Sequence, residues 1–549
     1  MEDNQHVSPL LALPAELVYH VLSYLSPLDL ARVACTCRRL QTLSYDDRIW
    51  QVLISENLPE PVTESTPLKT FRDLYVTHHP HWFLPRHRIW FADTEPNGKL
   101  LVARYDQRRG CIEAYAVTAV RGALGIELWE KDEDVVIHSF NPKVSLDLNQ
   151  PVLKLDVENL RTNDQPSRYP SDTGYAPPSR YSKETLMETF AEAGLYGSFM
   201  LTRSLSPNAI GPNTAVWPPL RFPALTRVRN DSMDGFTSAG HRPSSLQEVS
   251  QYNFRLRKWV EYTGRRSSPR IMSFTSPNGL SAAMGLGVNY FAGMNAVNGG
   301  MSVRMPEDIT TYATLPPECY TPTKQKPWQG IWCGDYSGHG CEFLVVLQPD
   351  KKDERPLPSG MNWLRSWFNG ETRRGSNSTE ASFASAREEL EPEGSATRPE
   401  SAIDDEPAEH KSGRQIASDD MTDYSDAASG RLEAVKLTGD PNIPRAEYTF
   451  VAPDIGQAGF VRVADEERFK GARVVRSAGH IAHRGFRDGM LIQNCENAQW
   501  PFSLTPFFPD QYVPSQLIMI SENRLAQFWE DFGHISYYQR VNLDALLKV

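Results

Sequence analysis

The residues WQGIWCGDYSGHGCEFLVVLQ (328–348) form two apolar runs separated by a short, glycine-rich polar segment. The tryptophan, isoleucine, phenylalanine and valine residues of the two runs are typical of β-strands. The segment between them, DYSGHG (335–340), suits a tight connection because glycine tolerates positive φ and Asp and Ser hydrogen-bond their own backbone. We therefore predict a β-hairpin here, and with it antiparallel pairing in this part of the chain.

The same loop contains the three side chains of a serine-hydrolase triad, Asp335, Ser337 and His339. In an extended chain, residues two apart are separated by about 6.6 Å and residues four apart by about 13 Å. The histidine of a triad must contact both partners, and here Asp335 lies out of its reach. The segment also lacks a G-x-S-x-G elbow between a strand and a helix. A β-barrel hydrolase is therefore only a remote alternative, and we predict no catalytic residue.

Alternating patterns extend the strand prediction in both directions. Before the hairpin they are KLLVARY (99–105), CIEAYAV (111–117), VSLDL (144–148) and VLKLDV (152–157); after it they run from RLEAVKLT (431–438) to HISYYQRV (534–541). Many short strands separated by turn residues predict a mostly antiparallel β-barrel, whose first part is 85–348 and whose second part is 431–549. Residues 161–250 are expected to be loop-rich, with a helical patch at 183–199.

Two further segments divide the chain. Residues 349–430 hold 18 acidic and 10 basic residues and are rich in Ser, which predicts a disordered acidic insert. Within this insert, MNWLRSWF (361–368) has two tryptophans at helical spacing. It is either a short partner-binding helix or a residual hydrophobic cluster with no partner. Residues 1–11 are expected to be a flexible N-terminus.

Composition narrows the classes of function. The net charge of −11 argues against a nucleic-acid-binding protein, since phosphate neutralisation needs clustered Lys and Arg. The seven cysteines include no C-x-x-C pair and fit reduced thiols. No secretory signal or membrane-spanning run is evident, so we expect an intracellular protein, cytoplasmic, nuclear or both.

A histidine-rich segment, HHPHWFLPRH (78–87), raises the question of a metal site. It offers His78, His79, His81 and His87, but no Cys or carboxylate accompanies them at ligand spacing. We predict no metal and no cofactor. Residues 58–84 are interpreted as a linker.

The region before that linker, 12–57, is a compact helical unit. Apolar residues recur at helical spacing after Pro14, and SPLD (26–29) resembles a capping box that starts a second helix. The predicted fold class is therefore α+β: an N-terminal three-helix unit followed by the β-barrel, with long disordered inserts.

The stretch LPAELVYHVLSYLSPLDLARVACTCRRLQTLSYDDRIW (13–50) resembles an F-box, with the L-P-x-E-L opening, the P-x-D-L middle, the C-R-R-L segment and the closing Trp. This resemblance implies docking on the Skp adaptor of a cullin-RING ubiquitin ligase. Carried over position by position, the implied adaptor-binding residues are Leu13, Pro14, Leu17, Val21, Leu22, Leu25, Pro27, Leu30 and Val33.

A second resemblance covers the strands. YSGHGCEFLVVL (336–347) and KLTGDPNIPRAEYTF (436–450) are similar to segments of the animal F-box-only protein family that targets D-type cyclins. That family implies a C-terminal β-barrel that binds the C-terminal ends of target proteins. In TGDPNIP (438–444), glycine and proline predict a rigid loop that suits holding a flexible tail, although such residues also suit a plain stiff turn. The expected peptide-binding residues are Tyr336, His339, Lys436, Thr438, Asp440 and Asn442.

Together these features predict a substrate-recognition subunit of an SCF-type ubiquitin ligase, with the Skp adaptor, the cullin and a protein target as partners. The target would be held through a C-terminal or other flexible tail and directed to ubiquitination and proteasomal degradation. The main alternative is a Skp-bound scaffold that holds a partner without a ligase role.

Overall fold

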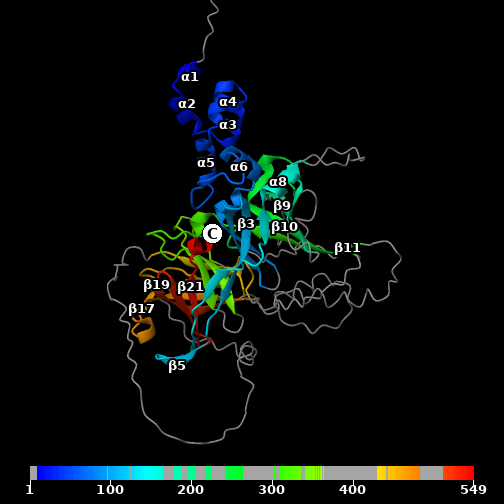
Figure 1. The fold of residues 1–549 in the computed structure, drawn as a ribbon. Helices are drawn as coiled ribbons and strands as arrows, with labels where there is room; N and C mark the ends of the chain where they lie inside the picture. The colour runs from blue at the N-terminus through cyan, green and yellow to red at the C-terminus, as the bar shows by residue number, and fades with distance from the viewer. Residues whose placement is uncertain are drawn as a thin grey trace, which may run out of the picture.

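The computed structural model describes residues 9–548 except 95–96, 124, 165–178, 188–194, 205–216, 220, 225–241, 264–301, 305–307, 336–339, 353, 355, 358, 362, 364–428, 440–442 and 483–510. Figure 1 shows N-terminal helices at one end of the molecule, a β-barrel towards the other end and a second sheet beside them. The predicted α+β class is confirmed.

The N-terminal unit consists of short helices: α1 (Pro9–Ala12), α2 (Ala15–Leu22), α3 (Pro27–Ala34), α4 (Arg38–Ser44) and α5 (Asp47–Ser55). The Ser26 hydroxyl caps α3 by accepting the backbone N–H of Asp29 at 3.2 Å, and Pro27 occupies the first helical position, as the sequence pattern indicates. The core of this unit is Val18, Leu22, Leu30, Leu40, Ile49 and Trp50.

The expected linker at 58–84 is instead part of the folded core. It contains α6 (Phe71–His78), and α7 (Phe83–His87) follows at once. The Asp47 carboxylate accepts the backbone N–H of Phe71 at 3.0 Å, which joins α5 to α6. Leu74, Trp82 and Phe83 are buried against the strands that follow. The signal for this packing in the sequence was the presence of large apolar residues within the otherwise polar, proline-containing stretch 58–84.

These helices pack on a sheet with the strand order β6-β3-β2-β1-β12-β10-β9-β8. Its strands are β1 (Ile89–Ala92), β2 (Lys99–Asp106), β3 (Cys111–Val120), β6 (Lys143–Leu146), β8 (Glu184–Met187), β9 (Leu195–Arg203), β10 (Val249–Thr263) and β12 (Asp308–Ala313). Two more strands, β7 (Leu153–Leu155) and β11 (Ser302–Arg304), pair with β3 and β10. The strands expected to form the first part of the barrel therefore make a separate sheet, since β1 continues to β12 and not to the hairpin at 330–347.

The helical patch expected at 183–199 is wrong. Its described residues lie in β8 and β9, which pair antiparallel with Thr185 opposite Phe199. The run contains good helix formers, but Thr185 and Met187 are buried while Leu186 between them is exposed, which is the alternation of a strand. Pairing with β9 overrides the local helix propensity. A short helix, α8 (Val157–Asp164), precedes this hairpin.

The second sheet closes into an antiparallel barrel. Its strands, in order, are β13 (Gly330–Asp335), β14 (Cys341–Leu347), β15 (Leu432–Thr438), β16 (Tyr448–Ala452), β18 (Arg473–Ile481), β19 (Gln511–Ser521), β20 (Arg524–Trp529) and β21 (His534–Arg540). The pairing of β21 with β13, with Gly334 opposite Tyr538, closes the ring. The hairpin predicted from 328–348 is β13–β14, with Asp335 opposite Cys341.

Two hairpins and one helix are attached to the barrel. β5 (Asp132–His138) pairs in parallel with the start of β21 and carries β4 (Ile126–Trp129), while β17 (Phe460–Val463) pairs with β18. The C-terminal helix α13 (Leu543–Leu547) returns to the first sheet, where the Arg104 guanidinium donates to the carbonyl of Lys548 at 3.3 Å. Both sheets share one large apolar cluster, so they pack as one body.

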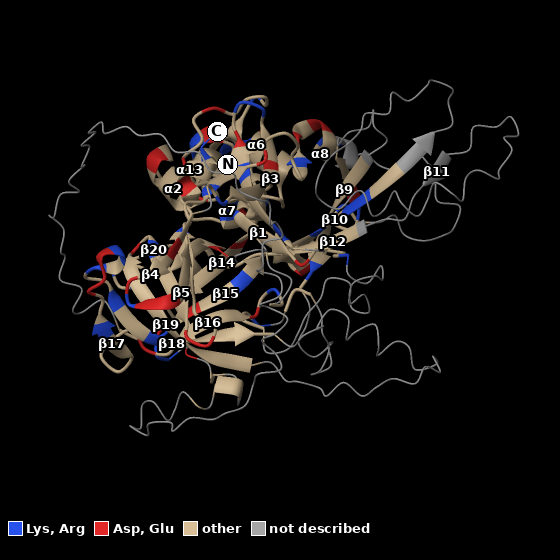
Figure 2. Ribbon diagram, turned by 90° about the horizontal axis from the view of Figure 1, so that it is seen from below, with Lys and Arg blue, Asp and Glu red and all other residues tan. Residues whose placement is uncertain are grey.

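Charged residues of both signs are spread over the ribbon in Figure 2, with basic residues visible along β10. Among the described residues, no helix is long and apolar enough to cross a membrane.

Candidate functional site

One end of the barrel gathers the connections that the sequence singled out. The β13–β14 connection and the segment after β15 both leave the barrel at this end, because Asp335 is opposite Cys341 and Thr438 is opposite Phe343. The end of β18 and the turn before β21 lie there too, as the antiparallel order requires. We call this the loop end. In Figure 1, β5, which pairs with the start of β21, lies on the side away from the N-terminal helices.

The interior of the barrel is apolar at one end and polar at the other. An apolar cluster takes residues from all the barrel strands, among them Trp332, Leu344, Leu432, Leu517 and Leu525. Toward the loop end, the same inward-facing positions are occupied by polar side chains that are almost fully buried: Glu342, Lys436, Ser477, Ser515, Gln527 and Ser536. Buried polar groups need partners, and five of these six residues, together with Tyr538, supply them to one another in two groups.

The first group is an ion pair between adjacent strands. Lys436 Nζ lies 2.7 Å from Glu342 Oε2, and the two side chains are 0% and 1% exposed. A pair this deeply buried pays a large desolvation cost, which only its mutual attraction and hydrogen bonds offset. It therefore fixes the positions of β14 and β15 at the loop end.

The second group is a chain of neutral hydrogen bonds across four strands. The Tyr538 hydroxyl donates to Gln527 Oε1 at 2.8 Å, the Gln527 amide donates to Ser515 Oγ at 3.0 Å, and Ser515 and Ser477 share a hydrogen bond at 2.7 Å. Each of these groups can both donate and accept, or offers both an amide and a carbonyl. The chain therefore joins β18, β19, β20 and β21 inside the barrel near the loop end.

The described residues on either side of 440–442 are held in place, while 440–442 themselves lie outside the described residues, so the rigid loop expected for TGDPNIP stays a prediction. Gly439 has φ +100°, and a Cβ there would lie 2.4 Å from the Cβ of Glu342, so only glycine fits. Arg445 is buried and its Nε lies 2.9 Å from Asp93 Oδ1, in the β1–β2 connection. The backbone N–H of Gly439 donates to Asn97 in the same connection at 2.7 Å. The first sheet thus supports the loop end of the barrel.

The predicted peptide-binding residues fall into two sets. Lys436 and Thr438 are both buried on β15 at the loop end. The expected alternation does not put them on one face, because a register shift pairs Lys436 with Leu344 and Thr438 with Phe343, which are neighbours on β14. Tyr336, His339, Asp440 and Asn442 lie outside the described residues, so their roles stay predictions. The sequence prediction missed Glu342, Ser515, Gln527 and Tyr538. Polar residues at alternate positions of otherwise apolar strands were the available signal.

The apparent triad is also only partly described, because Ser337 and His339 lie outside the described residues. Asp335 Oδ2 lies 2.7 Å from the Arg121 guanidinium and the Asp335 side chain is fully buried. This ion pair gives Asp335 a structural role at the end of β13. A neighbouring thiol, Cys333, has its pKa raised by its hydrogen bond with Cys341 and by burial, so it stays protonated.

The N-terminal unit has an apolar row on its surface. Leu17 and Val21 lie one turn apart on α2, Tyr24 follows in the turn after α2, and Leu28 is in the first turn of α3; they are 51%, 47%, 77% and 46% exposed. Of the residues expected to bind the adaptor, Leu17, Val21 and Pro14 are exposed, while Leu13, Leu25, Pro27 and Val33 are partly buried. Leu22 and Leu30 are in the helical core, at 3% and 0% exposed, so they support this surface from inside. Tyr24 and Leu28 were missed.

Comparison with known families agrees with this division of the chain. Residues 10–54 match the F-box-like family, and residues 312–545, which include the whole barrel, match the Cyclin D1 binding domain family. No curated protein matches the chain. The chain therefore has an F-box-like domain at its N-terminus and a Cyclin D1 binding domain in its C-terminal region. Its pair of domains is that of the F-box proteins that target D-type cyclins, which confirms the resemblance seen in the sequence.

Proposed function

We propose that this chain is the substrate-receptor subunit of a cullin-RING ubiquitin ligase. The F-box docks on a Skp adaptor, which links the chain to a cullin, and the loop end of the barrel binds a flexible tail of the target. The chain itself carries out no chemistry. It places lysines of the target near a charged ubiquitin-conjugating enzyme, which raises their effective concentration there.

The observation that carries this proposal is the pairing of two unlike surfaces on one chain. Leu17, Val21, Tyr24 and Leu28 are apolar or aromatic side chains exposed on one small helical unit, and exposed apolar surface of this kind favours burial against a partner. The barrel supplies the second surface, since its interior is polar at one end only.

The substrate is proposed to be a peptide tail because the residues flanking the 440–442 loop are anchored at the loop end, through Arg445 to Asp93 and through Gly439 to Asn97, and an anchored receptor loop suits holding a flexible chain. The ion pair of Lys436 with Glu342 and the chain from Tyr538 to Ser477 are already ordered in the free protein. Preordered partners lower the entropy cost of binding. The matched family makes the tail of a D-type cyclin the first substrate to test.

The test uses the full chain expressed in cells, followed by affinity capture. Wild type should recover a Skp adaptor and a cullin, and the double variant Leu17→Asp/Val21→Asp should recover neither. The matched control, Val461→Asp/Val463→Asp, places the same charges on exposed valines of β17 and should behave as wild type. Recovery of the adaptor by the F-box double variant would refute the docking surface.

The same captures separate a ligase receptor from a plain scaffold. Proteins bound to the barrel should accumulate when the F-box variant replaces wild type, because they are still bound but no longer ubiquitinated. Unchanged half-lives of these proteins would favour the scaffold.

A further inference from the structure

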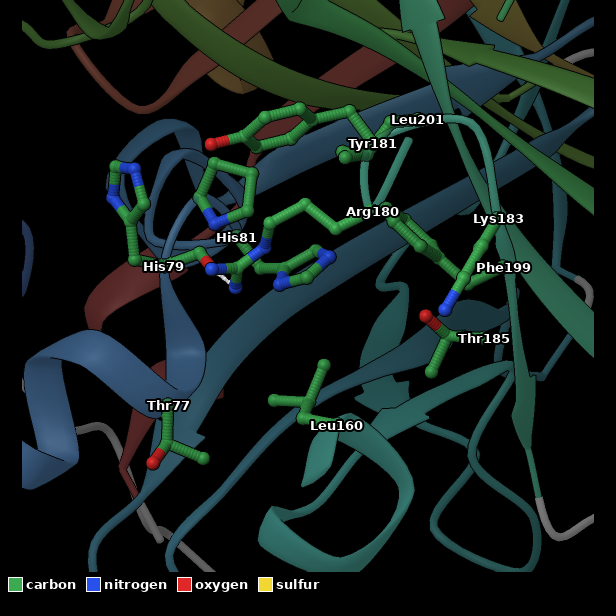
Figure 3. A pocket seen from close by; sticks show the side chains of 11 residues that line it. Thr77, His79, His81, Leu160, Arg180, Tyr181, Lys183, Thr185, Phe199 and Leu201 are labelled. Atoms are coloured by element: carbon green, nitrogen blue, oxygen red, sulfur yellow. Dashed lines mark hydrogen bonds between the residues drawn. The ribbon is translucent and has the colours of Figure 1, made fainter. Parts of the chain in front are cut away.

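A second polar hollow lies on the first sheet, outside both matched regions. It is a small pocket, partly open to solvent, between the α6–α7 segment, α8 and the β8–β9 hairpin. Figure 3 shows Arg180 beside His79 and His81 on one side and Lys183 beside Thr185 on the other. The apolar side chains of Leu160, Phe199 and Leu201 complete the lining.

The lining is cationic. It contains one arginine and one lysine, Arg180 and Lys183, and no acidic residue is among the side chains that line it. Hydroxyl groups of Thr77, Tyr181 and Thr185 also line the pocket and can donate hydrogen bonds. The nearest acidic residue in sequence, Glu184, is on the opposite face of β8, where Arg257 lies 2.9 Å away and Ser198 donates to it at 2.7 Å.

The walls hold the basic groups in place. The Arg180 guanidinium donates to the carbonyl of His79 at 3.3 Å and lies 5.7 Å from the ring of Tyr181. His81 donates through Nδ1 to the carbonyl of His78 at 3.1 Å, and its ring packs edge-on against Phe199 at 5.2 Å. The pocket is therefore built from side chains that already have defined positions.

The two histidines in the lining, His79 and His81, both have lowered pKa values. Burial first, and then the charge of Arg180, lower the pKa of His79 to about 4. Burial also lowers the pKa of His81 to about 3, with Arg180 among the further causes. Both rings are therefore neutral at pH 7, and the pocket's positive charge comes from Arg180 and Lys183.

We propose that this pocket binds a phosphate monoester, with Arg180 and Lys183 as the charged contacts and the surrounding hydroxyls as further donors. A phosphate monoester carries a charge of about −1.5 to −2 at pH 7 and has three acceptor oxygens. Two cations and several donors match that group, whereas a carboxylate offers one charge and two oxygens. The ligand is either a phosphorylated side chain or a free phosphate compound.

The proposal is independent of the receptor function, since the pocket is formed by residues 77–201, before the match to the Cyclin D1 binding domain and after the F-box. The test is isothermal titration calorimetry of the full chain with phenyl phosphate and with benzoate. The variant is Arg180→Gln/Lys183→Gln. The control is Lys99→Gln/Lys470→Gln, which removes two charges from exposed lysines elsewhere.

We expect wild type and control to bind phenyl phosphate at least tenfold more tightly than the pocket variant, and at least tenfold more tightly than benzoate. Equal affinity of wild type and pocket variant, no measurable binding to wild type, or equal affinity for benzoate would each overturn the proposal. The unfolding midpoint of each variant, measured alongside, shows that the chain is folded.

Two further probes identify the source of the phosphate. A short alanine peptide with one phosphoserine should bind more tightly than inorganic phosphate if the ligand is a modified side chain. If inorganic phosphate binds as tightly as the peptide, the ligand is a free phosphate compound. Either result supports phosphate binding at this pocket, provided that the Arg180→Gln/Lys183→Gln variant binds the same probe at least tenfold more weakly than wild type.

Discussion

Replacing Lys436 with methionine tests the most deeply buried charge in the barrel. The substitution keeps the apolar stem but removes the ammonium group 2.7 Å from Glu342. Because the Glu342 side chain is 1% exposed, its carboxylate would be left without this partner and away from water. Breaking a buried pair in this way costs roughly 3–5 kcal/mol, which lowers the ratio of folded to unfolded protein about a hundredfold or more.

The assay is urea unfolding of the full chain, followed by the fluorescence of tryptophan, since Trp332 is fully buried inside the barrel. A matched control is Arg32→Met, which breaks an ion pair with Asp29 whose side chains are 69% and 47% exposed. An exposed pair of this kind is screened by water and salt and contributes little to stability, so the control should unfold almost as wild type does.

The double variant Glu342→Met/Lys436→Met completes the cycle. Replacing both partners by apolar residues of similar size should restore most of the lost stability, because no isolated charge remains. The refolded barrel should nevertheless bind target tails less well, since its loop end has lost two polar groups. A Lys436→Met variant that costs less than about 1 kcal/mol, or a double variant no more stable than the single, would refute the buried pair as described.

Three more predictions follow from single residues. Gly439→Ala should lower both stability and tail capture, because the alanine would need positive φ and its Cβ would collide with Glu342 on the neighbouring strand. Gly471→Ala, with φ +80° and open space around it, should lower stability by only about 1 kcal/mol. Equal losses of stability in the two variants would contradict the packing argument. Burial lowers the pKa of His78 from 6.5 to about 4, so the free energy of unfolding should be flat above pH 6.5 and fall as the pH drops towards 4. In a His78→Phe variant, the free energy of unfolding should differ between pH 7 and pH 5 by about 2 kcal/mol less than in wild type. An unchanged difference would show that His78 is not the source of this pH dependence. Asp440→Asn should weaken tail capture while adaptor capture is unchanged; equal loss of both would indicate misfolding, and normal tail capture would remove Asp440 from the site.

The sequence predicts best where the causes are local. The β13–β14 hairpin follows from two apolar runs around a glycine-rich connection, and the capped start of α3 follows from Ser26 and Pro27. The same local rules fail at 183–199, where pairing with β9 decides the structure and not the helix propensity of the run.

Other features depend on contacts that sequence spacing does not reveal. The partner of Lys436 is Glu342, on the far side of the 349–430 segment, and a register shift between Phe343 and Leu344 sets how the two strands align. The separate first sheet is a similar case, because β1 pairs with β12 although more than half of the chain before β12 lies between the two strands. The support of the loop end by Asp93 and Arg445 likewise joins the two sheets.

The central claim is that one chain connects an adaptor at its F-box with a target tail at the loop end of its barrel. The most direct measurement is quantitative proteomics of proteins captured by wild type, by Leu17→Asp/Val21→Asp and by Glu342→Met/Lys436→Met. We expect the F-box variant to lose the Skp adaptor and cullin but keep the targets, and the barrel variant to keep the adaptor but lose the targets. Targets retained by the barrel variant, or both sets lost together from either folded variant, would contradict it.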